Sequence, residues 1–406
     1  MINASLISST NRVETPFIIV KIGDYTFGHY GKQTSNNASK VTFPKYVQRL
    51  NVTKVNGAIN TYTIVLDYAI TEYDDPNMLE AVFASVSNSR KIIISYGDLS
   101  NPLYMFKEEE ALITKLQTNV SVEQSKITYT ISCTSTSLAL KSGAQSFNAR
   151  RAKPSDVIIE LFNDTTTGLQ DIFRGMTPDT LSQFITTDDQ IVELEAKISI
   201  NVFDYISYLV KCMVSTADSS PDIRTCRYYW SVFDDISNIY GGTYFKVNRV
   251  SINDTYDDEY NTYTVDVGYP SGNNVTSFTV NNDDSWSILY NYSKQLNVPQ
   301  YTYKINNEGV IESVESPSFL LANKQTTVRE IDRAWWTNVT QFPINATLTI
   351  KGLLRPAMLM SFVRVNTYFY GKKHVSSGLY IITKQQDQID TSGYRTTLSL
   401  TRIRGD

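Results

Sequence analysis

Few residues in this sequence have the chemistry of a catalytic base or nucleophile. There are only two histidines, His29 and His374, and they lie in opposite terminal regions. A cysteine nucleophile needs a neighbouring base, and Cys133 with His29 is the pair that the chain offers. Cys133 nevertheless belongs to the alternating segment 129–133, which predicts a buried structural thiol rather than a reactive one.

A glycine-rich segment near the N-terminus has a superficial likeness to a phosphate-binding loop. Gly23 and Gly28 enclose four residues, and Gly31-Lys32 follows them. A phosphate loop requires lysine directly after the second glycine and then serine or threonine, and neither condition holds. A β-hairpin with turn glycines is therefore predicted over this segment.

Acidic residues gather in the loop 254–259, where carboxylate oxygens could bind Ca²⁺. Their spacing differs from the EF-hand pattern and the loop lacks the required glycine, so a solvated hairpin tip is the favoured interpretation and cation binding is left open. No pair of carboxylates is singled out for glycoside cleavage. We therefore predict no catalytic, cofactor-binding or metal-ligating residue, no cofactor, and a protein that is not an enzyme. The acidic residues of the loop are Asp254, Asp257, Asp258 and Glu259.

The composition bounds the fold and the function. The chain has 406 residues, of which 41% are hydrophobic, and this predicts two to four packed domains. Its 27 tyrosines favour β structure. The net charge of −4 without a run of Lys and Arg argues against a nucleic-acid-binding surface. The three cysteines form no CxxC pair, which favours a reduced compartment, and neither a membrane span nor a secretory leader is predicted.

Alternating apolar and polar residues predict β strands through most of the segment 17–140. A single helix is predicted at 76–87, and Asn56-Gly57 is a hairpin signal. Together these elements indicate a β-barrel or sandwich with one packed helix. The strands are predicted at 17–22, 41–43, 47–55, 62–68, 91–96, 111–116 and 127–138.

The composition changes at residues 142–153, and helices are predicted beyond this point. One helix is expected at 154–162 and a further turn at 170–174. The segment 201–214 has apolar residues at three- and four-residue steps, which is the pattern of an amphipathic helix. Residues 149–239 are therefore predicted to form a mixed α+β insertion between β units.

Strands are predicted again in the last part of the chain, together with a helix at 327–337. The stretch 342–406 alternates clearly, with Leu348 and Leu398 on apolar faces of two strands. Its short strands and tight turns predict a small closed or nearly closed β unit. The strands before this stretch are predicted at 243–250, 263–267, 278–280, 288–290, 301–305 and 310–311.

The C-terminal stretch also resembles a known family. The segments 346–356, 377–384 and 393–402 look like the end of phage tail baseplate hub proteins, which are related to the hub portion of contractile secretion-system spikes. The segment 153–158 resembles the start of the helical insertion of such hubs. Trp335-Trp336 lies where the last domain of such a hub would be entered.

The resemblance implies a mainly β or α+β chain with two tube-type β-barrel domains and an α+β insertion between them. Residues 1–145 would form the N-terminal tube-like barrel, and residues 146–240 the insertion. Residues 241–330 would be a β-rich middle region that contributes to the second tube domain. Residues 331–406 would supply the C-terminal strands of that second barrel.

The resemblance also implies a function. Such hubs are homotrimers in which each chain supplies two β-barrels, so that a pseudo-sixfold ring connects the tail tube to the central spike or tip. The implied partners are two further copies of the chain, the tail tube protein, the central spike or tip protein and other baseplate proteins. DNA would pass through the lumen without specific binding, and no membrane insertion is expected. The expected location is the virion, in a phage tail baseplate assembled in the host cytoplasm.

Two other functions stay open on the sequence alone. A carbohydrate- or receptor-binding β-protein of a virion would stack aromatic side chains on sugar faces, although the same side chains fit a core. A hydrolase on a β scaffold is the weaker alternative, because no carboxylate pair stands out. The tryptophans available for sugar stacking are Trp230, Trp286, Trp335 and Trp336.

Overall fold

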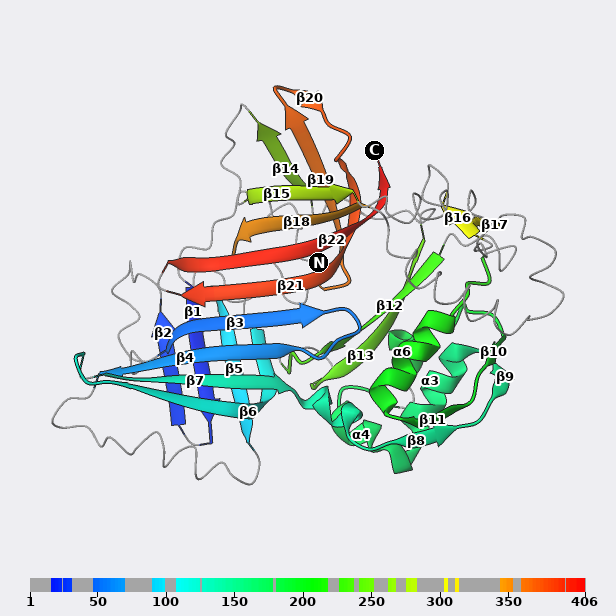
Figure 1. Ribbon diagram of the computed structural model, residues 1–406, viewed down its shortest axis with the longest axis horizontal. Helices are drawn as coiled ribbons and strands as arrows, with labels where there is room; N and C mark the ends of the chain where they lie inside the picture. The colour runs from blue at the N-terminus through cyan, green and yellow to red at the C-terminus, as the bar shows by residue number, and fades with distance from the viewer. Residues whose placement is uncertain are drawn as a thin grey trace, which may run out of the picture.

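The computed structural model describes residues 16–23, 25–30, 47–69, 90–98, 107–124, 126–177, 180–217, 226–236, 241–251, 262–267, 275–282, 303–305, 311–313, 344–352, 359–390 and 392–405. An N-terminal β unit, a helical insertion and a C-terminal β unit make up this part of the chain (Figure 1). One sheet passes through both β units, and it is antiparallel except where its strands at 262–267 and 362–369 pair in parallel. The prediction of a mainly β chain is therefore confirmed.

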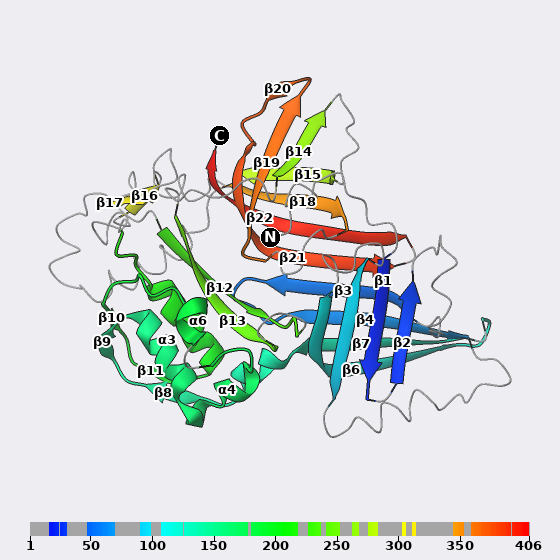
Figure 2. The ribbon, with the colours of Figure 1, turned by 180° about the vertical axis from the view of Figure 1, so that it is seen from behind.

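The N-terminal unit contains β1 (Pro16–Ile22), β2 (Tyr25–Tyr30), β3 (Val47–Val55), β4 (Thr61–Ala69), β5 (Lys91–Asp98), β6 (Lys107–Ser121) and β7 (Lys126–Ser135). Its strands follow the order β3-β4-β7-β6-β5-β1-β2. The sheet curls so that β1, β2 and β5 cross behind β3, β4 and β7, and β2 contacts β3 (Figures 1 and 2). Within the described residues, β2 and β3 form no ladder, and a ladder between them would close this sheet into a ring.

Period-two alternation explains these strands. Ile18, Val20 and Ile22 of β1 are fully buried, as are alternate residues of the other strands. The strands predicted at 17–22, 47–55, 62–68, 91–96 and 111–116 are confirmed. The segments 41–43 and 76–87 lie outside the described residues.

The prediction of a strand over 127–138 is wrong at its end. β7 stops at Ser135, and Thr136–Lys141 forms a 3₁₀ helix. The Ser135 hydroxyl accepts a hydrogen bond from the Ser137 backbone N–H at 3.1 Å and thereby caps this helix. A side chain that hydrogen-bonds to a nearby backbone N–H can end a strand even where the apolar pattern continues.

Among its described residues, the insertion packs four α helices and a 3₁₀ turn (Thr165–Thr167) against short strands. Its elements are β8 (Gln145–Phe147), β9 (Arg150–Ala152), α3 (Pro154–Asn163), α4 (Leu169–Ile172), α5 (Leu181–Phe184), β10 (Val192–Leu194), β11 (Lys197–Ile200), α6 (Val202–Cys212), β12 (Cys226–Phe233) and β13 (Tyr244–Ser251). Pro154 occupies the first turn of α3, and the Asn201 side chain caps α6 by accepting from the Asp204 backbone N–H at 2.8 Å. The helices predicted at 154–162 and 201–214 are confirmed.

The insertion has a hydrophobic core of its own, which includes Ile158 of α3, Ile206 of α6 and Phe245 of β13. The strand β13 pairs with β12 and with no other named strand of the described chain. The predicted boundary between residues 240 and 241 thus falls between two paired strands, and the domain limits stay predictions.

The C-terminal unit contains β14 (Thr262–Val267), β15 (Val275–Asn282), β18 (Ile344–Lys351), β19 (Phe362–Phe369), β20 (Lys372–Lys373), β21 (Gly378–Asp390) and β22 (Gly393–Gly405). Its strands follow the order β15-β18-β22-β21-β19-β14, and β14 contacts β15. A separate hairpin pairs β16 (Tyr303–Ile305) with β17 (Ile311–Ser313). Among the described residues, β14 and β15 form no ladder, and a ladder between them would close this unit into a ring.

Leu348 of β18 lies opposite Leu398 of β22, and both side chains are fully buried. The alternation predicted for these two strands is therefore confirmed. The predicted segments 288–290 and 327–337 lie outside the described residues.

β21 joins the two β units. One of its edges pairs with β22 along the whole strand. The other edge pairs first with β19, where Ile381 lies opposite Phe362, and then with β3, where Lys384 lies opposite Val55. The hydrophobic core consequently runs through both units. Neither unit forms a closed barrel within the described chain, so the two barrels stay a prediction.

Candidate functional site at the junction of the β units and the insertion

Charged side chains are buried together where the three parts of the chain meet. Lys54 of β3 is 2% exposed, and Glu109 of β6 and Asp234, the residue after β12, are fully buried. Lys54 follows Leu50 and Val52 at two-residue steps, so the strand turns it toward the core. Buried charges of this kind are stable only when they are paired and hydrogen-bonded.

Three donors surround the Glu109 carboxylate. The Lys54 ammonium forms an ion pair with Oε1. The Tyr62 hydroxyl donates to Oε2 at 2.7 Å, and the Tyr96 hydroxyl donates to Oε1 at 2.9 Å. These charge-assisted bonds link β3, β4, β5 and β6 inside the N-terminal unit.

Asp234 ties the insertion to the same group. The Ser135 hydroxyl donates to its Oδ1 at 2.6 Å, and the Asn60 side-chain amide donates to its Oδ2 at 2.7 Å. The Tyr62 hydroxyl lies 3.0 Å from the same Oδ2. Burial raises the pKa of Asp234 to about 6, although the bonds from Ser135 and Asn60 oppose this shift. The Asp234 carboxylate therefore anchors the end of β12 to the N-terminal unit.

The C-terminal unit contributes Asp387 of β21. Its carboxylate accepts from the Gln385 amide at 2.6 Å and from the Thr396 hydroxyl at 2.7 Å. Burial alone lowers the pKa of Lys54, but the attraction of Glu109, and then of Asp387 and Asp234, raises the pKa overall. Carboxylates from all three parts of the chain thus stabilise one buried ammonium group.

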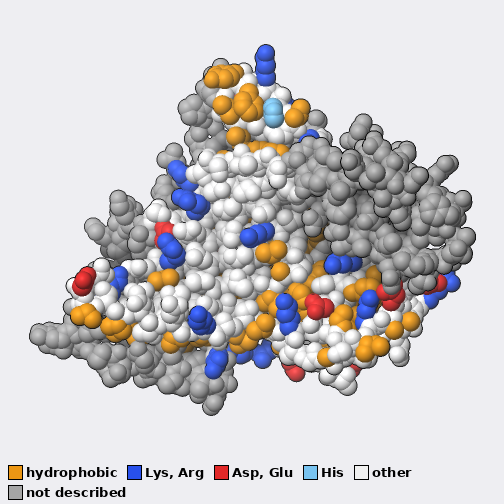
Figure 3. Space-filling model, in the orientation of Figure 1, with side chains coloured by type: hydrophobic (Ala, Val, Ile, Leu, Met, Phe, Trp, Pro, Cys, Tyr) orange, Lys and Arg blue, Asp and Glu red, His pale blue; other side chains and the backbone are white. Residues whose placement is uncertain are grey.

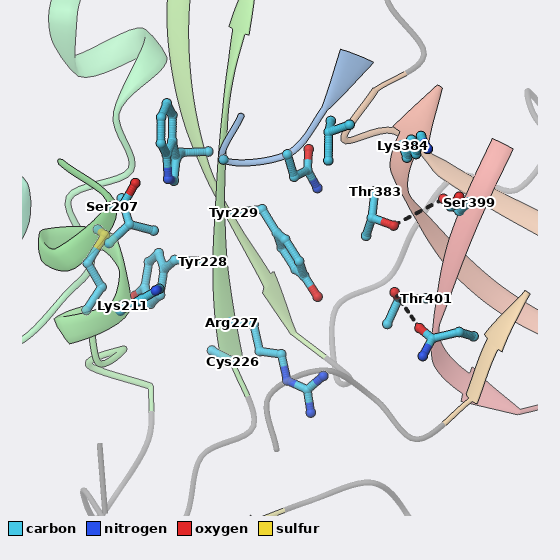
Figure 4. Close-up of a pocket in the computed structure, with 17 residues that line it drawn as sticks. Ser207, Lys211, Cys226, Arg227, Tyr228, Tyr229, Thr383, Lys384, Ser399 and Thr401 are labelled. Carbon is cyan, nitrogen blue, oxygen red and sulfur yellow. Dashed lines mark hydrogen bonds between the residues drawn. The ribbon is translucent and has the colours of Figure 1, made fainter. Parts of the chain in front are cut away.

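A cavity of about 610 Å³ opens beside this junction, between α6 and β12 on one side and β21 and β22 on the other (Figure 4). Tyr228 lies on the α6 side of β12, whereas Tyr229 points toward Thr383 and Thr401. The turn after β3 closes one end, where the Gly57 N–H donates to the Trp230 carbonyl at 2.8 Å. Three cationic residues, Lys211, Arg227 and Lys384, line the cavity.

The residues that the sequence suggested for chemistry are placed as follows. Cys133 is 3% exposed, and burial raises the pKa of its thiol to about 12, which confirms a buried structural thiol. His29 belongs to β2, opposite Ile18 of β1. His374 follows β20, and its Nδ1 lies 2.9 Å from the Ser376 hydroxyl, so it fixes a turn. Gly23 adopts a left-handed φ of 57° between β1 and β2, which confirms the hairpin predicted there.

Other sequence predictions can be placed only in part. The acidic loop 254–259 and the tryptophans at 286, 335 and 336 lie outside the described residues. Trp230 is 5% exposed and packs within the core of the insertion, as the core alternative predicts. Within the described residues, no cluster of three potential metal ligands occurs, and no helix has the length and apolarity to cross a membrane.

Lys54, Glu109, Asp234 and the cavity were not predicted from the sequence. A signal was present for the first two residues. Lys54 and Glu109 each occupy the apolar phase of an alternating strand, where a charged residue is exceptional. Asp234 and the cavity depend on the pairing of distant segments, for which the local pattern holds no signal.

No protein-family model and no curated protein matches this sequence. Solved structures do align with it. The 43 kDa tail protein of prophage MuSo2 from Shewanella oneidensis aligns over 96% of this chain and 100% of its own, with 10% identity and a TM-score of 0.49. A tail protein from Neisseria meningitidis MC58 aligns over 95% and 96%, with 9% identity and a TM-score of 0.48. The c3393 protein of E. coli, a type VI secretion component, aligns over 91% and 77%, with 11% identity and a TM-score of 0.44.

Two of these three solved structures are phage tail proteins, and the third is a component of a type VI secretion system.

Proposed function

We propose that this chain is the structural hub of a phage tail baseplate. Three copies would place six β units around one axis, and this ring would connect the tail tube to the central spike or tip. The proposal covers a location in the virion, assembly in the host cytoplasm, contacts with the tube, spike and other baseplate proteins, and passage of DNA without specific binding. It assigns the chain no catalytic activity.

The observation that carries the proposal is the likeness of the two β units within one chain. Over the part of the chain that the structure describes, each is a curled sheet in which one more ladder would complete a ring, namely β2–β3 in the first unit and β14–β15 in the second. The ladder between β3 and β21 joins them edge to edge. A chain with two similar units can present six similar surfaces when three copies assemble by cyclic symmetry. Asp387 of the second unit also attracts the buried Lys54 of the first, which adds to the contact between the two units.

Each β unit also extends a hairpin with an exposed apolar tip. Val120 and Val122 at the β6–β7 tip are 62% and 87% exposed. Tyr370 and Val375 near the β19–β20 tip are 72% and 80% exposed, and Figure 3 shows hydrophobic side chains gathered at that end. Exposed apolar groups at the ends of rigid hairpins are suited to contacts with neighbouring proteins.

Negative-stain electron microscopy of the purified chain tests the proposal. We expect rings with six lobes. The double variants Val120→Ser with Val122→Ser, and Tyr370→Ser with Val375→Ser, should reduce ring formation or its stacking on the tail tube without lowering the unfolding temperature. Ile198→Ser removes a side chain that is 83% exposed on β11 of the insertion, and it serves as the matched control. Absence of rings at every protein concentration would refute the proposal.

A further inference from the structure

One edge of β12 is open beside the cavity. β12 pairs with β13 along its other edge. At the open edge, the Val232 carbonyl accepts from the Asn60 side chain at 3.1 Å, and the Trp230 carbonyl accepts from the Gly57 N–H at 2.8 Å. The second half of this edge is therefore already used by groups of the N-terminal unit.

The backbone of Tyr228 continues the same edge. Alternate residues of a strand turn their N–H and C=O groups to the same side, so Tyr228 turns them to the side used by Trp230. The opposite strand agrees, because the Val247 carbonyl, across from Trp230, accepts from the Thr186 N–H on the far side of β13. No backbone hydrogen bond joins Tyr228 to a described element at the open edge. Its side chain is held separately, by a 2.9 Å bond from the hydroxyl to Asp188.

The cavity at this edge is cationic. Lys211 of α6, Arg227 of β12 and Lys384 of β21 line it, and no Asp or Glu occurs among the described lining residues. Arg227 is 7% exposed, and burial lowers its pKa to about 10, although a bond with Tyr229 opposes the shift. Arg227 therefore stays charged at neutral pH, in a position where a carboxylate would be strongly attracted.

We propose that an extended, acidic polypeptide segment of a partner protein binds in this cavity by adding to β12 at Tyr228. Its backbone hydrogen-bonds to Tyr228, as a strand does when it extends a sheet. Its carboxylates contact Arg227 and Lys384 on one face of the added strand, and its apolar side chains lie on the other face, toward Val210 and Met213, because side chains of a strand alternate between the two faces.

The open backbone edge favours a polypeptide over a free organic anion. A small carboxylate would satisfy the cations but would leave the N–H and C=O of Tyr228 at the edge unused. The volume of about 610 Å³ suits a few residues of extended chain. Strand addition thus uses both features of the cavity, its backbone edge and its charge.

Fluorescence anisotropy of a labelled hexapeptide of alternating glutamate and valine, titrated with the full chain at low salt, tests this inference. We expect saturable binding that weakens as salt is added. The same peptide with N-methyl groups on alternate amides keeps its charge but cannot form the ladder, and a peptide of alternating lysine and valine has the wrong charge. Both should bind at least roughly tenfold more weakly.

Variants then locate the binding site. Lys384→Gln and Arg227→Met should each weaken binding of the glutamate–valine peptide roughly tenfold, as expected for loss of one charge-assisted contact. Lys384→Gln changes a partly exposed side chain, so it separates the effect from folding even if Arg227→Met is unstable. Lys351→Gln removes an exposed lysine of β18 that does not line the cavity, and it should leave binding unchanged.

Three results would overturn the inference. The first is that no saturable binding is found below about 1 mM. The second is equal binding of the N-methylated peptide, which would indicate capture by charge alone. The third is an equal loss of peptide affinity in Lys384→Gln and Lys351→Gln. The first result would also be obtained if a segment of this chain itself occupied the cavity. Peptide binding and ring formation are independent measurements, so either proposal can fail without the other.

Discussion

Lys384 of β21 lies opposite Val55 of β3, only three residues after Ile381 of the same strand pairs with Phe362 of β19. One strand thus belongs to the C-terminal unit through its first half and reaches the N-terminal unit through its second. A register shift between Ile382 and Lys384 in the ladder with β22 accompanies this change of partner. The β21–β3 ladder therefore joins the two β units by backbone hydrogen bonds.

A disulfide across this ladder tests its register. Thr53 and Gln386 are cross-strand partners, and their paired positions suit the short Cβ separation that a disulfide needs. We expect Thr53→Cys with Gln386→Cys to cross-link under mild oxidation and to raise the unfolding temperature. Peptide mapping by mass spectrometry detects the bond and distinguishes it from pairing with native cysteines.

The control places one cysteine off register. Gln388 lies opposite Asn51, two residues along the ladder from Thr53. Thr53→Cys with Gln388→Cys should therefore cross-link poorly. Equal yields for the two pairs would show that the ladder assigned between the units is wrong.

The ion pair between Lys54 and Glu109 should be costly to break from one side. Lys54→Met leaves the Glu109 carboxylate buried without its cation, and we expect a loss of about 3–5 kcal/mol in the free energy of unfolding. The double variant Lys54→Met with Glu109→Gln should recover most of this loss, because no uncompensated charge stays buried. Urea unfolding of both single variants and the double variant measures the coupling, and purely additive losses would contradict the pairing.

Asp234 should make stability depend on pH in a defined window. Its folded-state pKa of about 6 lies above the ordinary aspartate pKa of 3.8, so the native state binds the proton more tightly than the unfolded state. The stabilisation from protonated Asp234 is present in full below about pH 4 and is lost as the pH rises through about 6, by up to about 3 kcal/mol.

The variant Asp234→Asn isolates this contribution. Since an amide does not titrate, the difference in unfolding free energy between the wild type and Asp234→Asn should change between about pH 4 and about pH 6 and stay constant at higher pH. Chemical denaturation across this range provides the measurement. Parallel pH profiles of the two proteins would mean that Asp234 titrates normally.

The strand register of the C-terminal unit has an equally direct test. Leu348 is fully buried opposite Leu398, whereas Thr347, one residue earlier, is exposed. Leu348→Asp or Leu398→Asp should destabilise the unit by roughly 3–5 kcal/mol, because each buries an unpaired carboxylate. Thr347→Asp should have little effect. Thermal unfolding followed by circular dichroism distinguishes these outcomes, and similar losses at positions 347 and 348 would reverse the assigned faces.

Local alternation predicted the strands well where one face is buried. The bounds of β3 were predicted at both ends, because Leu50 and Val52 alternate with polar residues. The strand β12 was missed, since most of its residues are buried on both faces and its pattern is continuous rather than alternating. The end of β7 was missed because the hydroxyl of Ser135 caps a 3₁₀ helix, an effect that apolar periodicity does not register.

The junction was harder to predict than the strands. Asp234 meets Asn60 and Ser135 across 174 and 99 residues of sequence, and neither contact has a local signature. The cavity likewise needs α6, β12 and β21 to lie together. A buried charge can be suspected from a Lys on the apolar phase of a strand, as at Lys54, but its partner is set only by the tertiary pairing of β3 with distant strands.

The mass of the chain in solution tests the central proposal most directly. Light scattering coupled to size exclusion, over a range of protein concentrations, separates a monomer from an assembly. We predict a species of three times the 46.0 kDa chain mass, whose fraction rises with concentration. A mass of one chain at every concentration, with the fold intact, would contradict the proposal that this protein is a trimeric baseplate hub.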